Sequence, residues 1–324
     1  MLGADTQGIP ATLIIVGPTA VGKSRLALAL AQEIGAEIVS ADSMQVYRGM
    51  DIGTAKPTAA EQKIARHHGV DIKNPDQGYS VGTFLKDARA ALHDIYERGK
   101  KAIVVGGAGF YLQALCQGFE PVSAYSPPEQ RKQIIDWVDQ NPPSAWKNLA
   151  ARAPFVAATI SPNDRYRIAR ALEVMALTGG TMAAQARQNS MEASPFLMVC
   201  LRLSPGSLQK QIVARTNAMI SDGLVAEVEQ LLAQGYAETL PAFKAIGYRE
   251  TIRYLRGGKT GGLSHLKAQI ILHTRQLSKR QYTWFRKFER DWPKDRFYWL
   301  DVDTGASVNE ILKIPGLRQR LHYC

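Results

Sequence analysis

The 324-residue sequence has few cysteines and no long apolar run, and each shortage excludes a class of protein. The three cysteines, Cys116, Cys200 and Cys324, are widely spaced and form no C-x-x-C pair, so neither a disulfide framework nor a zinc site is encoded. No apolar stretch approaches the roughly 18 residues that span a bilayer, and the N-terminus has no basic segment followed by such a stretch. We therefore expect a soluble, cytoplasmic monomer without a membrane partner.

The chain has fewer acidic than basic residues. It contains 40 Lys and Arg against 29 Asp and Glu, which gives a formal charge of +11. This balance favours a polyanionic partner such as nucleic acid, although a modest surplus of lysine also serves solubility. With 45% apolar residues the chain can bury a large core, and its length suggests two domains or one domain with an insertion.

Short apolar runs alternate with helix-like segments, which is typical of a parallel sheet in an α/β protein. The predicted strands are Thr12–Val16, Glu37–Ser40, Ala102–Val105 and Phe196–Leu203. Long helices are predicted at Leu208–Ser221, Leu224–Gln234 and Leu263 to about Phe288.

Seven of the 16 prolines fall between positions 121 and 162. Because proline interrupts helices and strands, this density predicts a small, mostly helical insertion made of short pieces. We expect residues 1–118 and 195–324 to form a P-loop NTPase-like core with a parallel sheet and a helical C-terminal part, and residues 119–194 to form the insertion domain.

The strand at Thr12–Val16 leads directly into a phosphate-binding motif, G-x-x-x-x-G-K-S, and then into the helical segment Arg25–Glu33. Its residues are Gly17, Pro18, Thr19, Ala20, Val21, Gly22, Lys23 and Ser24. The glycines let backbone N–H groups surround phosphate oxygens, and the helix N-terminus adds partial positive charge. Lys23 supplies a full charge and the Ser24 hydroxyl can hold Mg²⁺, so the chain handles a di- or triphosphate.

The usual second acid of a P-loop NTPase is missing after Ala102–Val105, which runs instead into Gly106–Gly109. Those glycines either allow a ligand to approach closely or merely end the strand. The only strand that leads into an acid is Glu37–Ser40, followed by Asp42. At the ligand edge of a parallel sheet Asp42 can orient a metal or act as a general base, and the alternative is a helix N-cap.

Two basic segments are candidate RNA contacts. Arg165, Arg167 and Arg170 lie on a predicted helix capped by Asn163 or Asp164. The segment 273–286 mixes cations, amides and aromatics, which suits binding to phosphates and stacking on bases. The alternative for both segments is an ordinary solvated helix face, with at least one aromatic of the second buried in the core.

Six ordered blocks resemble the tRNA dimethylallyltransferases of the bacterial type. They are GPTAVGKS (17–24), SADSMQVYRGMDIGTAKP (40–57), GGAGFYLQAL (106–115), RIARALEV (167–174), KAIGYRE (244–250) and TRQLSKRQYTWFR (274–286). The resemblance implies transfer of a dimethylallyl group from dimethylallyl diphosphate to the N6 amine of the adenosine 3′ of the anticodon in tRNA, with Mg²⁺. It also implies catalytic roles for Asp42, Thr19 and Lys23, with Asp42 as the general base.

The same resemblance implies tRNA contacts from four segments and one isolated residue. They are Asp42, Ser43, Met44 and Gln45; Ala108; Tyr166, Arg167, Ile168, Ala169 and Arg170; Lys244, Ala245, Ile246, Gly247, Tyr248 and Arg249; and Thr274, Arg275, Gln276, Leu277, Ser278, Lys279, Arg280 and Gln281.

The sequence departs from the family at two of these positions. Ala108 stands where the family usually has threonine, which removes a hydroxyl contact, and Tyr166 stands where glutamine is more common, which favours stacking over an amide hydrogen bond. Two other functions are compatible with the motifs: an ATP-dependent small-molecule kinase, and a P-loop protein that binds RNA without catalysis.

Overall fold

The computed structural model describes residues 12–117, 127–178, 194–305, 308–315 and 317. Cys324 and Pro121 lie outside the described residues. The chain divides into two compact units, one formed within residues 5–116 and 194–324 and the other within residues 117–193. Within the described residues, no helix combines the length and apolar character needed to cross a membrane.

The larger unit is built around one sheet. Its strands are β1 (Thr12–Val16), β2 (Ala36–Ala41), β3 (His67–His68), β4 (Lys101–Gly106), β5 (Phe196–Arg202) and β6 (Phe297–Asp301). Its helices are α1 (Lys23–Ile34), α2 (Ala59–Ile64), α3 (Val81–Glu97), α4 (Gly109–Gln117), α9 (Pro205–Ser221), α10 (Leu224–Ala233), the 3-10 helix η4 (Pro241–Lys244), α11 (Tyr248–Arg256), α12 (Gly262–Asp291) and α13 (Val308–Leu312).

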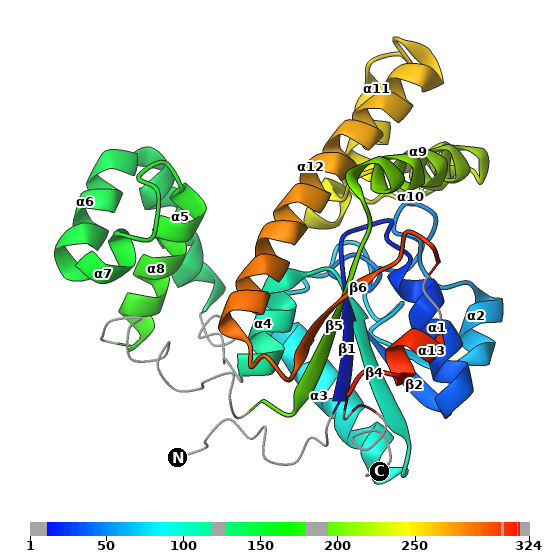
Figure 1. Cartoon of the computed structure of the whole chain (residues 1–324). Helices are drawn as coiled ribbons and strands as arrows, with labels where there is room; N and C mark the ends of the chain where they lie inside the picture. The colour runs from blue at the N-terminus through cyan, green and yellow to red at the C-terminus, as the bar shows by residue number, and fades with distance from the viewer. Residues whose placement is uncertain (1–11, 118–126, 179–193, 306–307, 316, 318–324) are drawn as a thin grey trace. The chain divides into compact units, whose positions relative to one another are not determined.

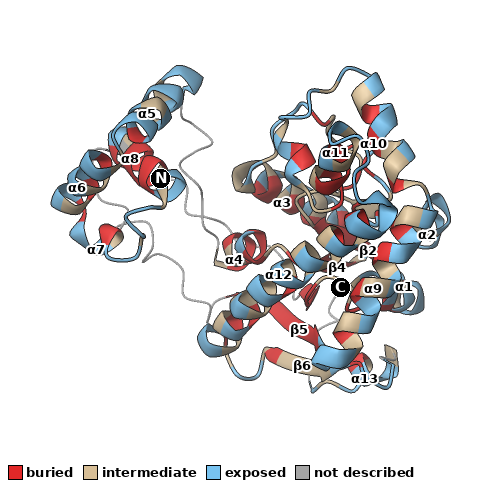
Figure 2. Cartoon of the chain, turned by 90° about the horizontal axis from the view of Figure 1, so that it is seen from above, coloured by how far each residue is buried: buried red, intermediate tan, exposed pale blue. Residues whose placement is uncertain are grey.

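The six strands are all parallel, in the order β3-β2-β4-β1-β5-β6. Helices α1, α2 and α13 cover one face of the sheet, and α3 and α4 lie on the other (Figure 1). Covered on both faces, β1, β2, most of β4 and most of β5 are buried, and β5 is seen as a buried strand in Figure 2. This burial explains the apolar runs in β1, β4 and β5.

The register of the central strands brings their carboxyl ends to one edge. Val16 of β1 and Ala41 of β2 both pair with Gly106 at the end of β4. The residues that follow, Gly17, Asp42 and Gly107, therefore leave the sheet side by side. This is the edge at which open parallel sheets bind ligands, and α9, α10 and α12 gather above it (Figure 1).

The opposite end of the sheet carries a buried charge cluster. Glu37, the second residue of β2, accepts hydrogen bonds from Arg98 at 2.6 and 2.8 Å and pairs with His68 Nε2 at 2.7 Å. The hydrogen bonds from Arg98 outweigh burial and lower the pKa of Glu37 to about 2. This carboxylate joins β2, β3 and the end of α3, on the side of the sheet away from the predicted phosphate loop.

The predicted strands and long helices are confirmed with small changes at their ends. β1 spans the predicted residues, whereas β5 ends at Arg202 rather than Leu203. β3 and β6 were not predicted, because β3 has only two residues and β6 is a five-residue edge strand of which most residues are only partly buried.

The smaller unit consists of α5 (Pro128–Gln140), α6 (Pro142–Arg152), α7 (Pro154–Ala157) and α8 (Arg165–Thr178). The first three helices each begin at a proline, where the missing N–H costs no hydrogen bond. The predicted short helical pieces are therefore observed. Their apolar faces form a separate core that includes Val138, Leu149 and Ile168.

Candidate active site

The loop between β1 and α1 has the backbone of an anion site. Gly17, Ala20 and Gly22 have φ of 150°, 67° and 95°, a region that favours glycine. A Cβ on Gly17 would lie 2.8 Å from the Leu201 carbonyl oxygen. Helix α1 follows with no side-chain cap and no acidic residue in its first turn. Its first N–H groups therefore offer an uncompensated positive end to a phosphate.

Lys23 folds back onto this loop and donates to the Pro18 carbonyl oxygen at 2.8 Å. Burial and, to a smaller extent, the charge of Arg215 lower the pKa of Lys23 to about 8, while Asp42 acts in the opposite direction. A phosphate at the loop would favour the charged ammonium, so Lys23 is suited to hold an anion.

Arg215 of α9 is a functional candidate that sequence reasoning missed. Its Nη1 donates to Thr19 Oγ1 at 3.2 Å, and burial lowers its pKa while the charge of Asp42 raises it. The available signal was its position, because Arg215 lies beside Ile212 and Thr216 on the buried face of α9. Arg215 and Lys23 place two cations at the loop, where a diphosphate would need them.

Asp42 occupies the predicted edge, but it does not cap a helix. Its Oδ1 accepts hydrogen bonds from the backbone N–H groups of Met44 at 2.8 Å and Gln45 at 3.4 Å, and turns follow it. The helix-cap alternative is therefore wrong, and the side chain instead stabilises an Asx-type turn. Its charge interacts with both Lys23 and Arg215, so one carboxylate lies among the cations of the phosphate loop.

The segment after Asp42 is anchored by charged side chains that the sequence did not single out. Lys56, with only 3% of its side chain exposed, pairs with Asp51 and Asp71 and donates to the Tyr47 carbonyl oxygen. From α10, the Glu227 carboxylate accepts N–H groups of residues 51, 52 and 53. These contacts fix the loop from which Asp42 projects.

Gly106–Gly109 meets other parts of the chain. A Cβ on Gly106 would lie 2.1 Å from the Ala41 carbonyl oxygen, and one on Gly109 would lie 2.5 Å from Trp284 Cγ. The sequence left two explanations for these glycines, close approach of a ligand or the end of a strand. The structure adds another: Gly106 lets β2 pack closely, and Gly109 lets α12 pack closely. Ala108, between them, is partly exposed.

Gln281 of α12 connects two loops of the site. Its Oε1 accepts the Thr19 N–H at 2.8 Å and its Nε2 donates to the Gly107 carbonyl oxygen at 3.0 Å. One side-chain amide thereby ties the phosphate loop to the end of β4. Gln281 was predicted as a tRNA contact, and the structure gives it this internal bridge.

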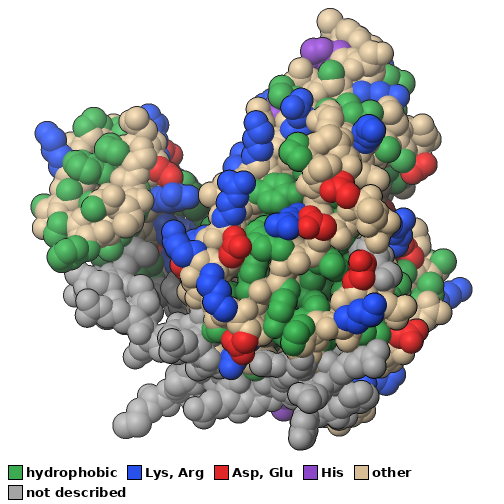
Figure 3. Space-filling view, in the orientation of Figure 1, with side chains coloured by type: hydrophobic (Ala, Val, Ile, Leu, Met, Phe, Trp, Pro, Cys, Tyr) green, Lys and Arg blue, Asp and Glu red, His purple; other side chains and the backbone are tan. Residues whose placement is uncertain are grey.

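The other predicted tRNA contacts on helix α12 are partly exposed to solvent and partly buried. Arg275, Gln276, Lys279 and Arg280 are exposed, whereas Ser278 is buried. Lys and Arg side chains follow this helix on the surface (Figure 3). Phe285 is fully buried, as expected for at least one aromatic of the segment. The basic face is thus available to a polyanion.

The contacts of segment 244–249 are mostly with other residues of the protein. Lys244 is exposed, but Tyr248 is fully buried and donates to Glu227 Oε1 at 2.5 Å. Arg249 donates to Glu250 Oε1, which also pairs with His273 Nδ1 at 2.7 Å. Among these positions, Lys244 and the half-exposed Arg249 are accessible to a partner.

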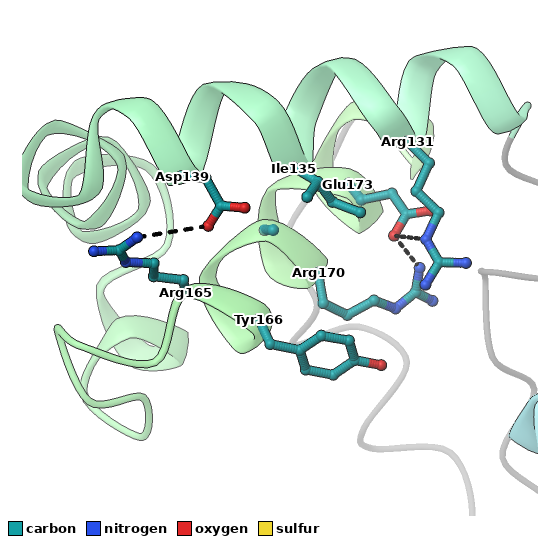
Figure 4. Close-up of a pocket in the computed structure, with 8 residues that line it drawn as sticks. Arg131, Ile135, Asp139, Arg165, Tyr166, Arg170 and Glu173 are labelled. Atoms are coloured by element: carbon teal, nitrogen blue, oxygen red, sulfur yellow. Dashed lines mark hydrogen bonds and ion pairs between the residues drawn. The ribbon is translucent and has the colours of Figure 1, made fainter. Parts of the chain in front are cut away.

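The segment 166–170 belongs to the smaller unit. Asp164 Oδ1 accepts the Arg167 N–H at 3.0 Å, so Asp164 is the cap of α8. Ile168 and Ala169 are buried, whereas Tyr166 is 72% exposed and lies beside Arg170 (Figure 4). Within this segment, Tyr166, Arg167 and Arg170 offer polar or aromatic groups to a ligand.

Comparison with known proteins places the chain in a family. The model of the IPP transferase family matches residues 45–288. The chain is 42% identical to the tRNA dimethylallyltransferase of Desulfosudis oleivorans, covering 96% of both chains, and 43% identical to tRNA dimethylallyltransferase 1 of Citrifermentans bemidjiense, covering 91% of this chain and 94% of that one.

Solved structures of similar proteins support the same family assignment. The full-length tRNA isopentenylpyrophosphate transferase of Bacillus halodurans matches with a TM-score of 0.69 and 33% identity, covering 97% of both chains. A eukaryotic dimethylallyltransferase acting on tRNA matches with a TM-score of 0.79 and 26% identity, covering 95% of this chain and 77% of that one. The chain belongs to the IPP transferase family. These findings do not favour the kinase alternative.

Proposed function

We propose that this protein transfers the dimethylallyl group of dimethylallyl diphosphate to the N6 amine of the adenosine 3′ of the anticodon in tRNA. The observation that carries the proposal is the convergence of the phosphate loop, Lys23, Arg215 and Asp42 at one edge of the sheet, in a chain of the IPP transferase family.

The reaction breaks the bond between the allylic carbon and the diphosphate oxygen and forms a bond from that carbon to N6. Negative charge grows on the departing diphosphate, and donors aimed at it act mainly in the transition state. The loop amides, Lys23 and Arg215 supply such donors, and Thr19 is held beside them by its contacts with Arg215 and Gln281.

The amine loses one proton as the new bond forms. Asp42 is the carboxylate at this edge, and its Oδ1 is oriented by two backbone N–H groups, so we assign it the role of proton acceptor. The acceptor adenine must leave the base stack to reach this position.

A magnesium ion is part of the proposal. Among the described residues no group of three His, Cys, Asp or Glu side chains could hold a metal. Ser24 lies exposed in the first turn of α1, next to Lys23. Mg²⁺ commonly takes few protein ligands and completes its shell with phosphate oxygens and water, so a single hydroxyl fits. Bound there, the ion would neutralise diphosphate charge.

The exposed basic face of α12 and the residues Tyr166, Arg167 and Arg170 are assigned to tRNA. The exposure of Tyr166 and Arg167 and the charges of the arginines and of α12 support this, since cations that neutralise phosphates supply a large share of the affinity for nucleic acid. The insertion, placed within residues 119–194, is proposed to carry part of this contact.

The proposal is tested by transfer of labelled dimethylallyl groups from the diphosphate to bulk tRNA, with Mg²⁺ and without any nucleoside triphosphate. Wild-type protein should label tRNA, and Lys23→Ala and Arg215→Ala should label it at least about 100-fold more slowly. Lys210→Ala, which removes an exposed cation from the same helix as Arg215, is the matched control. Labelling that requires ATP would contradict the proposal.

A further inference from the structure

The smaller unit contains a pocket of about 290 Å³ between α5 and α8. Arg131 and Ile135 line it from α5, and Tyr166, Arg170 and Glu173 line it from α8 (Figure 4). The shared core of the unit, which includes Val138 and Ile168, holds the two helices together. The pocket is therefore built on rigid elements.

A buried carboxylate orients two arginines at one side of this pocket. Only 4% of the Glu173 side chain is exposed, and its Oε2 lies 2.6 Å from Arg170 Nη1 and 3.9 Å from Arg131 Nε. The second oxygen, Oε1, is buried with no hydrogen-bond partner among the described residues. Two guanidinium groups against one carboxylate leave an excess positive charge.

The guanidinium groups keep unused donors. Each arginine has five N–H donors in a planar fork, and Glu173 occupies few of them. Figure 4 shows the heads of Arg131 and Arg170 next to each other. Such a preoriented pair matches the geometry of a phosphate group, which guanidinium groups bind through paired hydrogen bonds.

An aromatic face lies beside the arginine pair. The Tyr166 ring lies next to Arg170 in Figure 4, and 72% of the residue is exposed. Ile135, 38% exposed, adds an apolar wall. An exposed ring is a platform for a nucleobase, and proteins that bind single-stranded RNA combine such rings with cations that contact the backbone.

We propose that this pocket binds one unstacked nucleotide of the tRNA, with its phosphate on Arg131 and Arg170 and its base against Tyr166. Glu173 acts as a positioning residue that holds the arginine pair. The inference rests on the proposed function and adds to it α5, Arg131 and a role for Glu173, which lies in the block RIARALEV but had been given no function.

The first test compares dissociation constants for an unmodified tRNA transcript with adenosine 3′ of the anticodon. Tyr166→Ala should weaken binding about 10-fold, whereas Tyr166→Phe, which keeps the ring, should stay within about 2-fold of wild type. Phe155→Ala is the matched control, because Phe155 is 85% exposed in the same unit and does not line the pocket. It should bind as wild type does.

The second test measures how binding depends on salt. Arg131→Ala should reduce the slope of log affinity against log salt by roughly one unit, because one phosphate contact is lost. Arg152→Ala removes an exposed arginine of α6 that does not line the pocket and should leave the slope unchanged. Equal slopes for the Arg131 and Arg152 variants would overturn the phosphate assignment.

The third test uses tRNAs that each carry one abasic nucleotide in the anticodon stem and loop. At one position the missing base should weaken wild-type binding about 10-fold and have no further effect on Tyr166→Ala. The inference is overturned if no position shows this coupling, or if Tyr166→Phe is as weak as Tyr166→Ala. Wild-type labelling of tRNA with normal binding by all pocket variants refutes the pocket alone, whereas absence of wild-type labelling refutes the proposed function.

Discussion

Replacing Asp42 by asparagine separates the two roles that the structure gives this side chain. Asparagine keeps an Oδ1 that can accept the N–H groups of Met44 and Gln45, but it cannot take a proton. Alanine removes both the acceptor and the base. Comparing the two variants therefore isolates the chemistry from the turn.

The expected effects differ in size. A general base contributes about 10²- to 10⁴-fold, so both Asp42→Asn and Asp42→Ala should lower kcat on that scale. Both also lose the charge that faces Lys23 and Arg215, so this loss cancels in their comparison. The two variants then differ only in the turn, which asparagine can hold through one good hydrogen bond at 2.8 Å and one weak bond at 3.4 Å. Because alanine loses both bonds, its free energy of unfolding should be lower by about 1 kcal/mol.

The assays are steady-state labelling of tRNA for kcat, single-turnover labelling for the rate of the chemical step, and urea unfolding for stability. Asp222→Asn, which removes an exposed carboxylate at the end of α9 in the same unit, is the control and should behave as wild type does. A rate for Asp42→Asn within a few-fold of wild type, with the fold intact, would refute the base role. A rate for alanine far below that of asparagine would assign the effect to the turn.

Three further outcomes follow from the site and the sheet. Because the pKa of Lys23 is about 8, the affinity for inorganic pyrophosphate should fall above pH 8 by up to about 10-fold per pH unit. In Lys23→Arg the binding affinity, measured over the same pH range, should lack this fall. Gly109→Ala, whose Cβ would lie 2.5 Å from Trp284, should lose about 1–3 kcal/mol in thermal unfolding, whereas Gly206→Ala, with open space around it, should lose nothing. Glu37 has a folded pKa of about 2 against an ordinary value of 4.5, so its ion pairs stabilise the fold fully above pH 4.5. As the pH falls from 4.5 to 2, this contribution to the free energy of unfolding, at most about 3 kcal/mol, should be lost. The free energy of unfolding of Glu37→Gln should therefore depend less on pH over this range.

The sequence predicted the parts of the site that depend on local pattern. Continuous apolar strands, a glycine loop and a following helix identify the phosphate loop within one stretch of chain. The position of Asp42 followed from a general property of parallel sheets, and the pairing of Val16 and Ala41 with Gly106 confirms the shared edge.

The remaining features depend on tertiary contacts between distant segments. Arg215 reaches Thr19 across 196 positions of sequence, and Gln281 reaches it across 262. No motif links such residues, because their meeting depends on how α9 and α12 pack above the sheet. The close packing at Gly107 and Gly109 has the same origin, so a glycine run alone could not distinguish helix packing from ligand approach.

The most direct measurement of the central claim is mass spectrometry of tRNA nucleosides after incubation with the protein, dimethylallyl diphosphate and Mg²⁺, with no nucleoside triphosphate present. The account predicts adenosine carrying one dimethylallyl group on N6, at the position 3′ of the anticodon, and release of one diphosphate for each modified tRNA. Lys23→Ala should give almost none of this product, whereas Lys210→Ala should give the wild-type yield. Unmodified adenosine from wild-type protein, or product formed only with ATP and in proportion to its hydrolysis, would contradict the account.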